Sequence, residues 1–179
     1  MKDLKISGLN FDIVWKDKKE NFRRIEELLG NTPTDIFVLP EMIMTAFYMN
    51  QEEIKDWQNE NLDWIKSFAK KTDTAICGSA SVYENNHFFN RFYFVLPDGS
   101  YDQYDKRHLF SFTGEDKKYS AGTERVIVNY KGWRILLQVC YDLRFPVFAR
   151  NNDDYDAILY VANWPEMRID AWKTLLKAR

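Results

Sequence analysis

WRILLQVCYDLRFP (residues 133–146) is the stretch of sequence that determines the fold class. Its first half, residues 133–139, is an apolar run with the length and composition of a buried strand. Cys140 follows that strand at once. Before it, residues 126–130 predict a second strand, joined to the first through Lys131-Gly132 as a hairpin. The pattern therefore indicates a sheet that carries a thiol at the carboxyl end of one strand.

The remaining segments alternate between helical and strand-like patterns. Residues 18–29 place apolar side chains on one helical stripe that ends at Gly30, and residues 51–71 predict a second helix. Helices that alternate with strands, some paired as hairpins, predict a layered α/β fold with a mixed sheet. The other predicted strands are residues 4–11, 35–39, 74–83, 88–96, 101–104 and 157–162, of which the last is expected to be buried. Further helices are predicted to begin at 146–151 and 169–179.

Length and composition fit a single globular domain, residues 1–179. The chain is 45% hydrophobic and 29% charged, with a formal net charge of −2, so it can bury a substantial core. Basic and acidic residues are interspersed, which argues against nucleic acid or an anionic membrane as a partner. The sequence has no apolar signal segment and no stretch of membrane-spanning length. Two cysteines are too few for a disulfide framework, so we predict a cytoplasmic protein with reduced thiols.

Glu41, Lys106 and Cys140 each come directly after a predicted strand. Because ligands of α/β sheets bind at the carboxyl ends of strands, we expect the three side chains to converge at one edge. Together they would supply a nucleophile, a proton acceptor and a donor to an oxyanion, which are the parts that acyl transfer needs. Taken singly, each has an ordinary interpretation as a capping glutamate, a surface lysine or a small buried cysteine. Cys77, in the middle of the strand AICGSA, fits the last of these.

Motifs of several other functional classes are absent from the sequence. There is no glycine-rich phosphate loop, no H-E-x-x-H and no C-x-x-C. We therefore expect neither a metal ion nor another cofactor.

The words around the three reactive residues resemble the signatures of the nitrilase, or carbon–nitrogen hydrolase, superfamily. They are VLPEMIMTAF around Glu41, YDKRHLF around Lys106 and LQVCYDLRFPVFAR around Cys140, in the order that the family has them. VANWP at 161–165 is a fourth match. The wording CYDLRFP followed by DYDAILYVANWP is most similar to the omega-amidase branch, which hydrolyses amides of 2-oxo dicarboxylic acids. The resemblance implies an αββα-type layered sandwich with mixed sheets.

The resemblance also implies a role for each catalytic residue. Cys140 would be the thiol nucleophile that forms an acyl-thioester, Glu41 the general base and Lys106 the electrostatic stabiliser. The family uses a second glutamate between the lysine and cysteine motifs. Glu115, in TGEDKKYSAG, matches its position and would orient Lys106 and assist water.

A further set of residues would bind substrate or support the nucleophile. The backbone N–H of Tyr141 would join the oxyanion hole. Asp142 and Arg144 would fix the turn that carries the nucleophile, with Arg144 close to the substrate. Phe47 and Trp164 would be walls of the pocket.

Family members continue past Arg179 and supply further strands and helices. The resemblance therefore implies that the C-terminal part of the fold is missing from residues 1–179, and it assigns the activity to the intact protein. It also implies a small-molecule amide as the substrate and a homodimer as the assembly.

Other functions compete with this interpretation. One alternative is a cysteine hydrolase that pairs Cys140 with His108 as its base. A second is an inactive, nitrilase-like binding or assembly domain. A third is a hydrolase of the same superfamily that acts on a different small amide, a carbamoyl amide or a nitrile, since these substrates share the same thiol chemistry.

Overall fold

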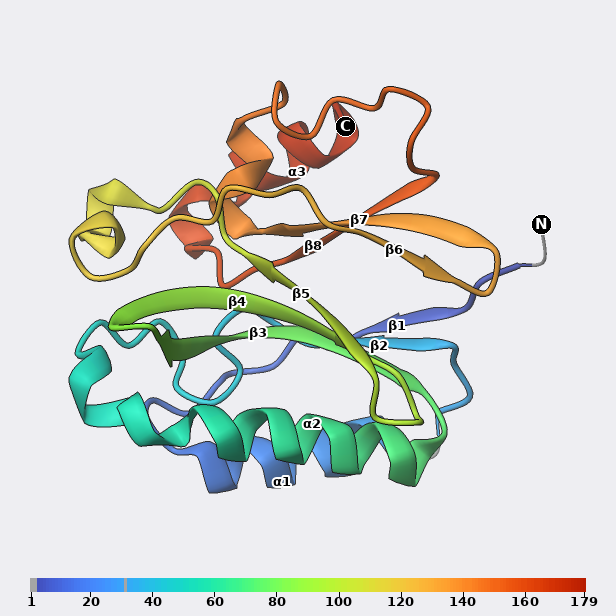
Figure 1. Ribbon diagram of the computed structural model, residues 1–179, viewed down its shortest axis with the longest axis horizontal. Helices are drawn as coiled ribbons and strands as arrows, with labels where there is room; N and C mark the ends of the chain where they lie inside the picture. Colours follow the sequence, from blue (N-terminus) through green and yellow to red (C-terminus); the bar gives the residue numbers. More distant parts are fainter. Residues whose placement is uncertain (1–2, 31) are drawn as a thin grey trace.

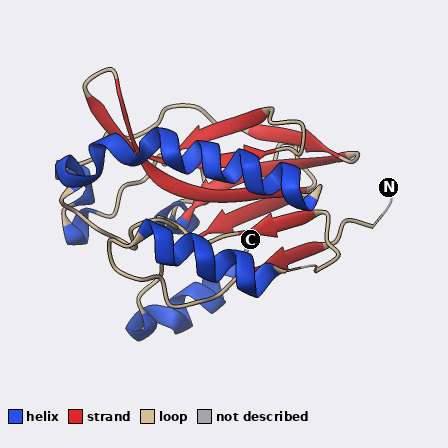
Figure 2. Ribbon diagram, turned by 90° about the horizontal axis from the view of Figure 1, so that it is seen from below, coloured by secondary structure: helices blue, strands red, loops and turns tan. Residues whose placement is uncertain are grey.

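The computed structural model describes residues 3–30 and 32–179, and within these ranges two sheets pack against each other between layers of helix. Figure 1 shows helices α1 and α2 below the larger sheet, and α3 beyond the smaller sheet on the opposite side. The layers therefore follow the order α, β, β, α that the resemblance implies. Figure 2, seen from below, shows two helices lying side by side across the strands. The helices are α1 (Lys18–Leu29), α2 (Gln58–Thr72) and α3 (Ile169–Lys177).

Both sheets are mixed. The larger has the order β1-β2-β3-β4-β5, in which β1, β2 and β3 are parallel and β4 and β5 continue as antiparallel neighbours. The smaller has the order β6-β7-β8, with β6 antiparallel and β8 parallel to β7. The strands are β1 (Ile6–Gly8), β2 (Ile36–Val38), β3 (Ala75–Glu84), β4 (His87–Val95), β5 (Tyr101–Asp105), β6 (Ile127–Tyr130), β7 (Trp133–Val139) and β8 (Ala157–Val161).

The sequence dictates the first helix at both ends. The Asp17 carboxylate accepts a hydrogen bond from the backbone N–H of Glu20, which caps the helix start. Gly30 ends the helix with φ 46°, a conformation that costs glycine little. Ile25 and Leu29 point from the helix into the core. The predicted bounds of α1 are confirmed.

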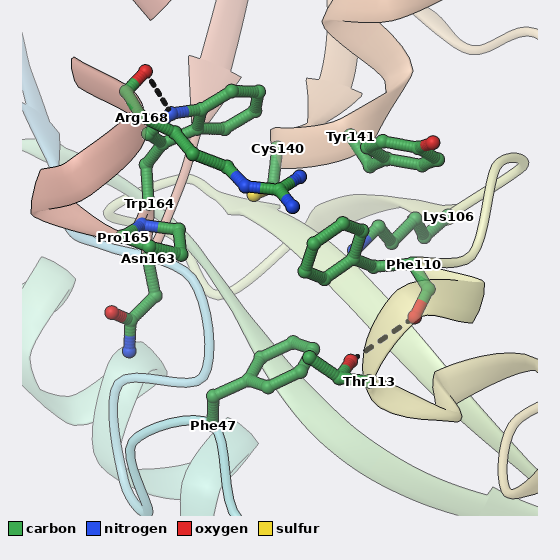
Figure 3. A pocket seen from close by; sticks show the side chains of 10 residues that line it. All are labelled: Phe47, Lys106, Phe110, Thr113, Cys140, Tyr141, Asn163, Trp164, Pro165 and Arg168. Atoms are coloured by element: carbon green, nitrogen blue, oxygen red, sulfur yellow. Dashed lines mark hydrogen bonds between the residues drawn. The ribbon is translucent and has the colours of Figure 1, made fainter.

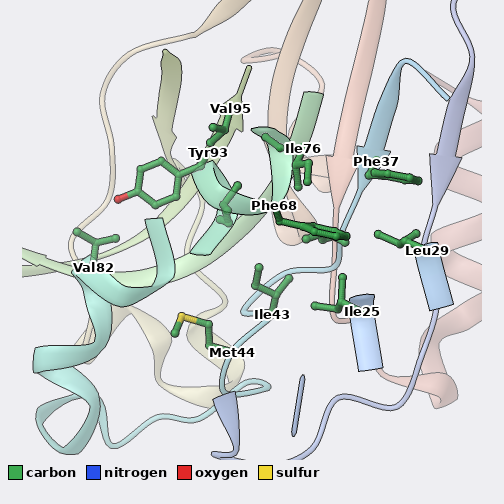
Figure 4. Close-up of a cluster of buried hydrophobic side chains, with 13 residues drawn as sticks. Ile25, Leu29, Phe37, Ile43, Met44, Phe68, Ile76, Val82, Tyr93 and Val95 are labelled. Carbon is green, nitrogen blue, oxygen red and sulfur yellow. The ribbon is translucent and has the colours of Figure 1, made fainter. Parts of the chain in front are cut away.

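Two apolar cores hold the layers together. The first lies between α1, α2 and the larger sheet, where Ile25, Phe37, Phe68 and Ile76 meet (Figure 4). The second lies between the two sheets. It contains aromatic side chains from β4 and β5 and aliphatic side chains from β7, namely Phe92, Phe94, Tyr104, Ile135, Leu137 and Val139. Cys140, directly after β7, belongs to this second core.

Three local predictions differ from the structure. Residues 146–151 form turns in place of a helix, because bonds such as Phe148 N–H to Phe145 O reach back only three residues. The segment 51–71 begins as a 3₁₀ helix, Gln51–Trp57, whose three-residue period puts buried Gln51 and Ile54 on one face. Strand β8 was predicted to be buried. It lies at the edge of its sheet, and only Val161 is fully buried.

Two further observations bear on function class. Within residues 3–30 and 32–179, no helix combines the length and apolar character needed to cross a bilayer. In the same part of the chain, no three His, Cys, Asp or Glu side chains gather closely enough to hold a metal ion.

Candidate active site

Glu41, Lys106 and Cys140 meet between the two sheets. Glu41 lies just beyond β2 and Lys106 just beyond β5, both in the larger sheet, whereas Cys140 follows β7 in the smaller sheet. The expected convergence therefore occurs, but it joins the strand ends of two facing sheets and not one sheet edge. Glu115, in the 3₁₀ helix Glu115–Lys117, completes the group.

The Lys106 ammonium is the centre of the polar cluster. Its Nζ donates to Glu41 Oε1 at 2.9 Å and to Glu115 Oε2 and Oε1 at 2.9 and 3.1 Å. All three side chains are fully buried. Burial alone lowers the pKa of Lys106, but the charges of Glu41 and Glu115 raise it well above its ordinary value. The lysine is therefore a permanent cation.

Glu115 is held by backbone as well as by side chains. Its Oε2 accepts from the backbone N–H of Phe110 at 2.6 Å, and its Oε1 accepts from Asn90 Nδ2 at 3.0 Å. Burial raises the pKa of Glu115; Lys106 opposes this effect and Glu41 adds to it. Glu115 thus fixes the position of Lys106.

Glu41 is oriented by three donors. Asn90 Nδ2 and Lys106 Nζ both donate to its Oε1, at 2.8 and 2.9 Å, and the backbone N–H of Asn163 donates to Oε2 at 3.0 Å. Sequence analysis missed Asn90, although a signal exists. It shares a face of β4 with Phe92 and Phe94, and a lone amide among inward-facing aromatics must find polar partners.

Cys140 occupies a sharp bend. Its φ is 47°, in a region that costs a non-glycine residue about 1–3 kcal/mol and that occurs often at functional sites. Cys140 is 7% exposed, and the Glu41 carboxylate is the nearest group that could accept its proton among those acting on the thiol. Burial and the charge of Glu41 raise the pKa of Cys140 well above its ordinary value, although Lys106 opposes them. These effects favour the neutral form of the thiol.

Asp142 fixes the bend that carries Cys140. Its Oδ2 accepts from the backbone N–H of Val139 at 2.9 Å and from the Tyr104 hydroxyl at 2.8 Å. Its Oδ1 lies 2.9 Å from the backbone N and 2.8 Å from Nδ1 of His108. The structure therefore places Asp142 where the sequence analysis expects it, at the turn that carries Cys140. His108 lines a different groove from the pocket that Cys140 lines, which argues against the alternative in which His108 is the base for Cys140.

A small pocket of about 130 Å³ opens onto the thiol (Figure 3). The predicted residues Phe47, Tyr141 and Trp164 line it. Arg144 does not: its side chain is exposed and lies in a separate surface groove. The lining also contains residues that sequence analysis did not select, namely Phe110, Thr113, Asn163, Pro165 and Arg168. The motif VANWP (161–165) is a sequence signal for this part of the lining, because Arg168 lies only three residues beyond it.

The two cysteines should differ sharply in alkylation. We expect iodoacetamide at neutral pH to label Cys140 at least about tenfold faster than Cys77, because reactivity needs access and a route for the thiol proton. Cys77 is fully buried inside β3, and burial raises its pKa with no base to compensate. Mass spectrometry of peptides from briefly treated protein measures the ratio. Denatured protein, in which both thiols should react alike, is the control. Equal labelling of the native protein would contradict the assigned environments.

Known proteins resemble this chain in sequence and in fold. The carbon-nitrogen hydrolase family model matches residues 5–179. Omega-amidase YafV of Yersinia enterocolitica is 48% identical over all of this chain and 70% of its own length. A 2-oxoglutaramate amidase of Bacillus subtilis is 34% identical, over 97% of this chain and 70% of its own. A carbon–nitrogen hydrolase superfamily protein from Xanthomonas campestris, solved with an arsenic adduct in its active site, superposes with a TM-score of 0.95 at 41% identity, over 99% of this chain and 71% of that one.

The chain therefore belongs to the carbon–nitrogen hydrolase family. It is an amidohydrolase by class. Within the family, it is similar to members of the omega-amidase branch. The chain spans about 70% of the length of those relatives.

Proposed function

We propose that the protein hydrolyses the C–N bond of a small amide through an acyl-thioester on Cys140. The observation that carries the proposal is the buried Lys106 ammonium, which donates to Glu41 Oε1 at 2.9 Å and lines the same pocket as Cys140. The nucleophile Cys140 and the cation Lys106 line the pocket, and the base Glu41 is hydrogen-bonded to Lys106. The pocket is smaller than the 300–1,000 Å³ typical of sites for drug-sized ligands, which favours a small substrate.

In the acylation half, Sγ of Cys140 attacks the amide carbon while its proton passes to Glu41. The carbonyl oxygen becomes an oxyanion, which the Lys106 ammonium and the backbone N–H of Tyr141 stabilise. Glu41 then returns the proton to the amide nitrogen. The C–N bond breaks, ammonia leaves and a thioester remains on Cys140.

In the deacylation half, water attacks the thioester carbon. Glu41 again accepts a proton, and Glu115 holds Lys106 in place and assists the water. The C–S bond breaks, and the proton held by Glu41 returns to the sulfur. The sum is an amide and water converted to a carboxylic acid and ammonia, with each residue restored.

The relatives and the pocket both support one class of substrate. Relatives in the omega-amidase branch include one named 2-oxoglutaramate amidase, which favours the monoamide of a 2-oxo dicarboxylic acid as substrate. Aromatic walls at Phe47, Phe110 and Trp164 suit a short carbon chain. The homodimer and the cytoplasmic location remain predictions.

A panel of short amides tests the proposal. Ammonia release should be fastest with monoamides of 2-oxo dicarboxylic acids, slower with the same monoamides lacking the 2-oxo group, and slowest with the matching nitriles. The 2-oxo group adds a hydrogen-bond acceptor, and a site built for such a group rejects analogues that lack it. The intact protein is assayed for ammonia with each compound. Faster release from the nitriles would transfer the proposal to nitrile hydrolysis, and no release from any amide would overturn it.

A further inference from the structure

Arg168 brings a second cation to the pocket. It ends the 3₁₀ helix Glu166–Arg168, immediately before α3, and its side chain extends into the pocket that Cys140 and Lys106 also line (Figure 3). Neither the catalytic steps above nor the sequence motifs give this arginine a task.

The backbone and side chain of Arg168 are both held in place. Its backbone N–H donates to Pro165 O at 2.9 Å, and its carbonyl accepts from Trp164 Nε1 at 2.9 Å. The guanidinium carbon lies 5.5 Å from the ring centroid of Phe110 and 4.8 Å from that of Phe112. Aromatic faces attract a guanidinium without consuming its N–H donors, so the group is oriented and still able to bind an anion.

Arg168 differs from Lys106 in its charge balance. Lys106 is bonded to two carboxylates, whereas no carboxylate of residues 3–30 and 32–179 lies within ion-pair distance of the Arg168 guanidinium. Two cations therefore line the pocket among the described residues, and Arg168 is the one that has no carboxylate partner there. Its natural complement is an anion that arrives with the ligand.

We infer that Arg168 binds a carboxylate at the end of the substrate remote from the scissile amide, and so determines specificity for anionic amides. The inference rests on the proposed function and adds a residue to it. Glu41 and Glu115 would repel an approaching anion, and Lys106 offsets only part of their charge. Arg168 offsets the remaining negative charge, and its guanidinium can bind a carboxylate through two parallel N–H···O hydrogen bonds. The aromatic side chains that line the same pocket can then pack against the carbon chain.

A matched pair of substrates isolates this role. Succinamate carries a terminal carboxylate, and butyramide replaces that carboxylate with a methyl group. In the unaltered protein kcat/KM should favour succinamate. Arg168→Gln should lower kcat/KM for succinamate roughly 10- to 100-fold, the factor expected for a hydrogen-bonded charged group, and change that for butyramide less than about threefold. Arg168→Lys should fall between, because it keeps the charge and loses the planar fork.

Arg150→Gln is the control variant. Arg150 is an exposed arginine in the separate surface groove, so its replacement removes the same net charge without touching the pocket. Its succinamate-to-butyramide ratio should equal that of the unaltered protein. If Arg168→Gln kept the unaltered ratio, or if the unaltered protein had no preference for succinamate, the carboxylate role would be overturned while amide hydrolysis stood.

Binding without turnover separates this inference from the proposed function. In the Cys140→Ala background, calorimetry should show succinamate binding that weakens roughly 10- to 100-fold when Arg168→Gln is added. If the active protein released no ammonia from either amide, the proposed hydrolysis would be wrong. The difference in binding would still support Arg168 as the residue that binds the carboxylate. Equal succinamate affinity in the two variants would contradict the proposed role of Arg168 in binding the carboxylate, whatever the activity.

Discussion

Cys140→Ser is expected to abolish ammonia release, lowering kcat by about 10⁴- to 10⁶-fold, because loss of the nucleophile leaves the other members of a cooperative site nothing to activate. Serine keeps a hydroxyl in nearly the same place. Its oxygen, however, is far less acidic than a thiol, and a carboxylate such as Glu41 is too weak a base to activate it. The measurement is ammonia release from the best amide of the panel, at enzyme concentrations high enough to detect residual turnover.

Cys77→Ala provides the matched control. It also removes a buried thiol, but one that lies in β3 and does not line the pocket. Its activity should stay near that of the unaltered protein at a temperature where both remain folded. Comparable losses in the two variants would point to a general effect on folding in place of a missing nucleophile.

The thioester itself can be trapped. Hydroxylamine added during turnover should divert part of the acyl group to a hydroxamate, because a thioester is open to attack by any good amine nucleophile. Mass spectrometry of acid-quenched turnover should find the acyl adduct on the peptide that contains Cys140. Retained activity in Cys140→Ser, together with no adduct on the unaltered protein, would favour direct attack by water.

Much of this site could be predicted from the sequence, because each reactive residue follows a strand. The apolar runs before Glu41 and Cys140 are readable as strands, and strand ends gather functional groups. The helix at residues 18–29 was also predictable, since Asp17 and Gly30 mark its two ends. These signals are local, and local signals survive folding when the hydrophobic pattern agrees with them.

Other features depend on contacts between distant segments. Asn90 reaches Glu41 and Glu115 only because β4 passes beneath both. Arg144 and Arg168 both lie in or near stretches that resemble the signatures of the family. Only Arg168 lines the pocket, whereas Arg144 lies in a separate groove. Spacing along the chain cannot rank them, because the direction of each side chain is set by the 3₁₀ turn that carries it.

Glu41→Gln is the second variant with a large expected effect. The amide keeps the size of the side chain and can still accept a hydrogen bond, but it cannot take the proton of Cys140. We expect kcat/KM to fall by roughly 10²- to 10⁴-fold, the usual contribution of general acid–base catalysis. Glu52→Gln, at an exposed position of the 3₁₀ helix Gln51–Trp57, is the control and should retain activity.

The pH dependence of the Glu41→Gln variant distinguishes loss of a base from simple distortion of the site. The Glu41 charge is one of the causes that raise the pKa of Cys140, whereas Lys106 lowers that pKa. Removing the Glu41 charge should therefore lower the pKa of Cys140, although burial still keeps it high. The thiol of the variant loses its proton to solvent as the pH rises, so the remaining kcat/KM should increase through the neutral and alkaline range. The unaltered protein, in which Glu41 takes the proton directly, should show a flatter profile there. Equal slopes for the two proteins, or near-normal turnover in the variant, would mean that a group other than Glu41 accepts the proton.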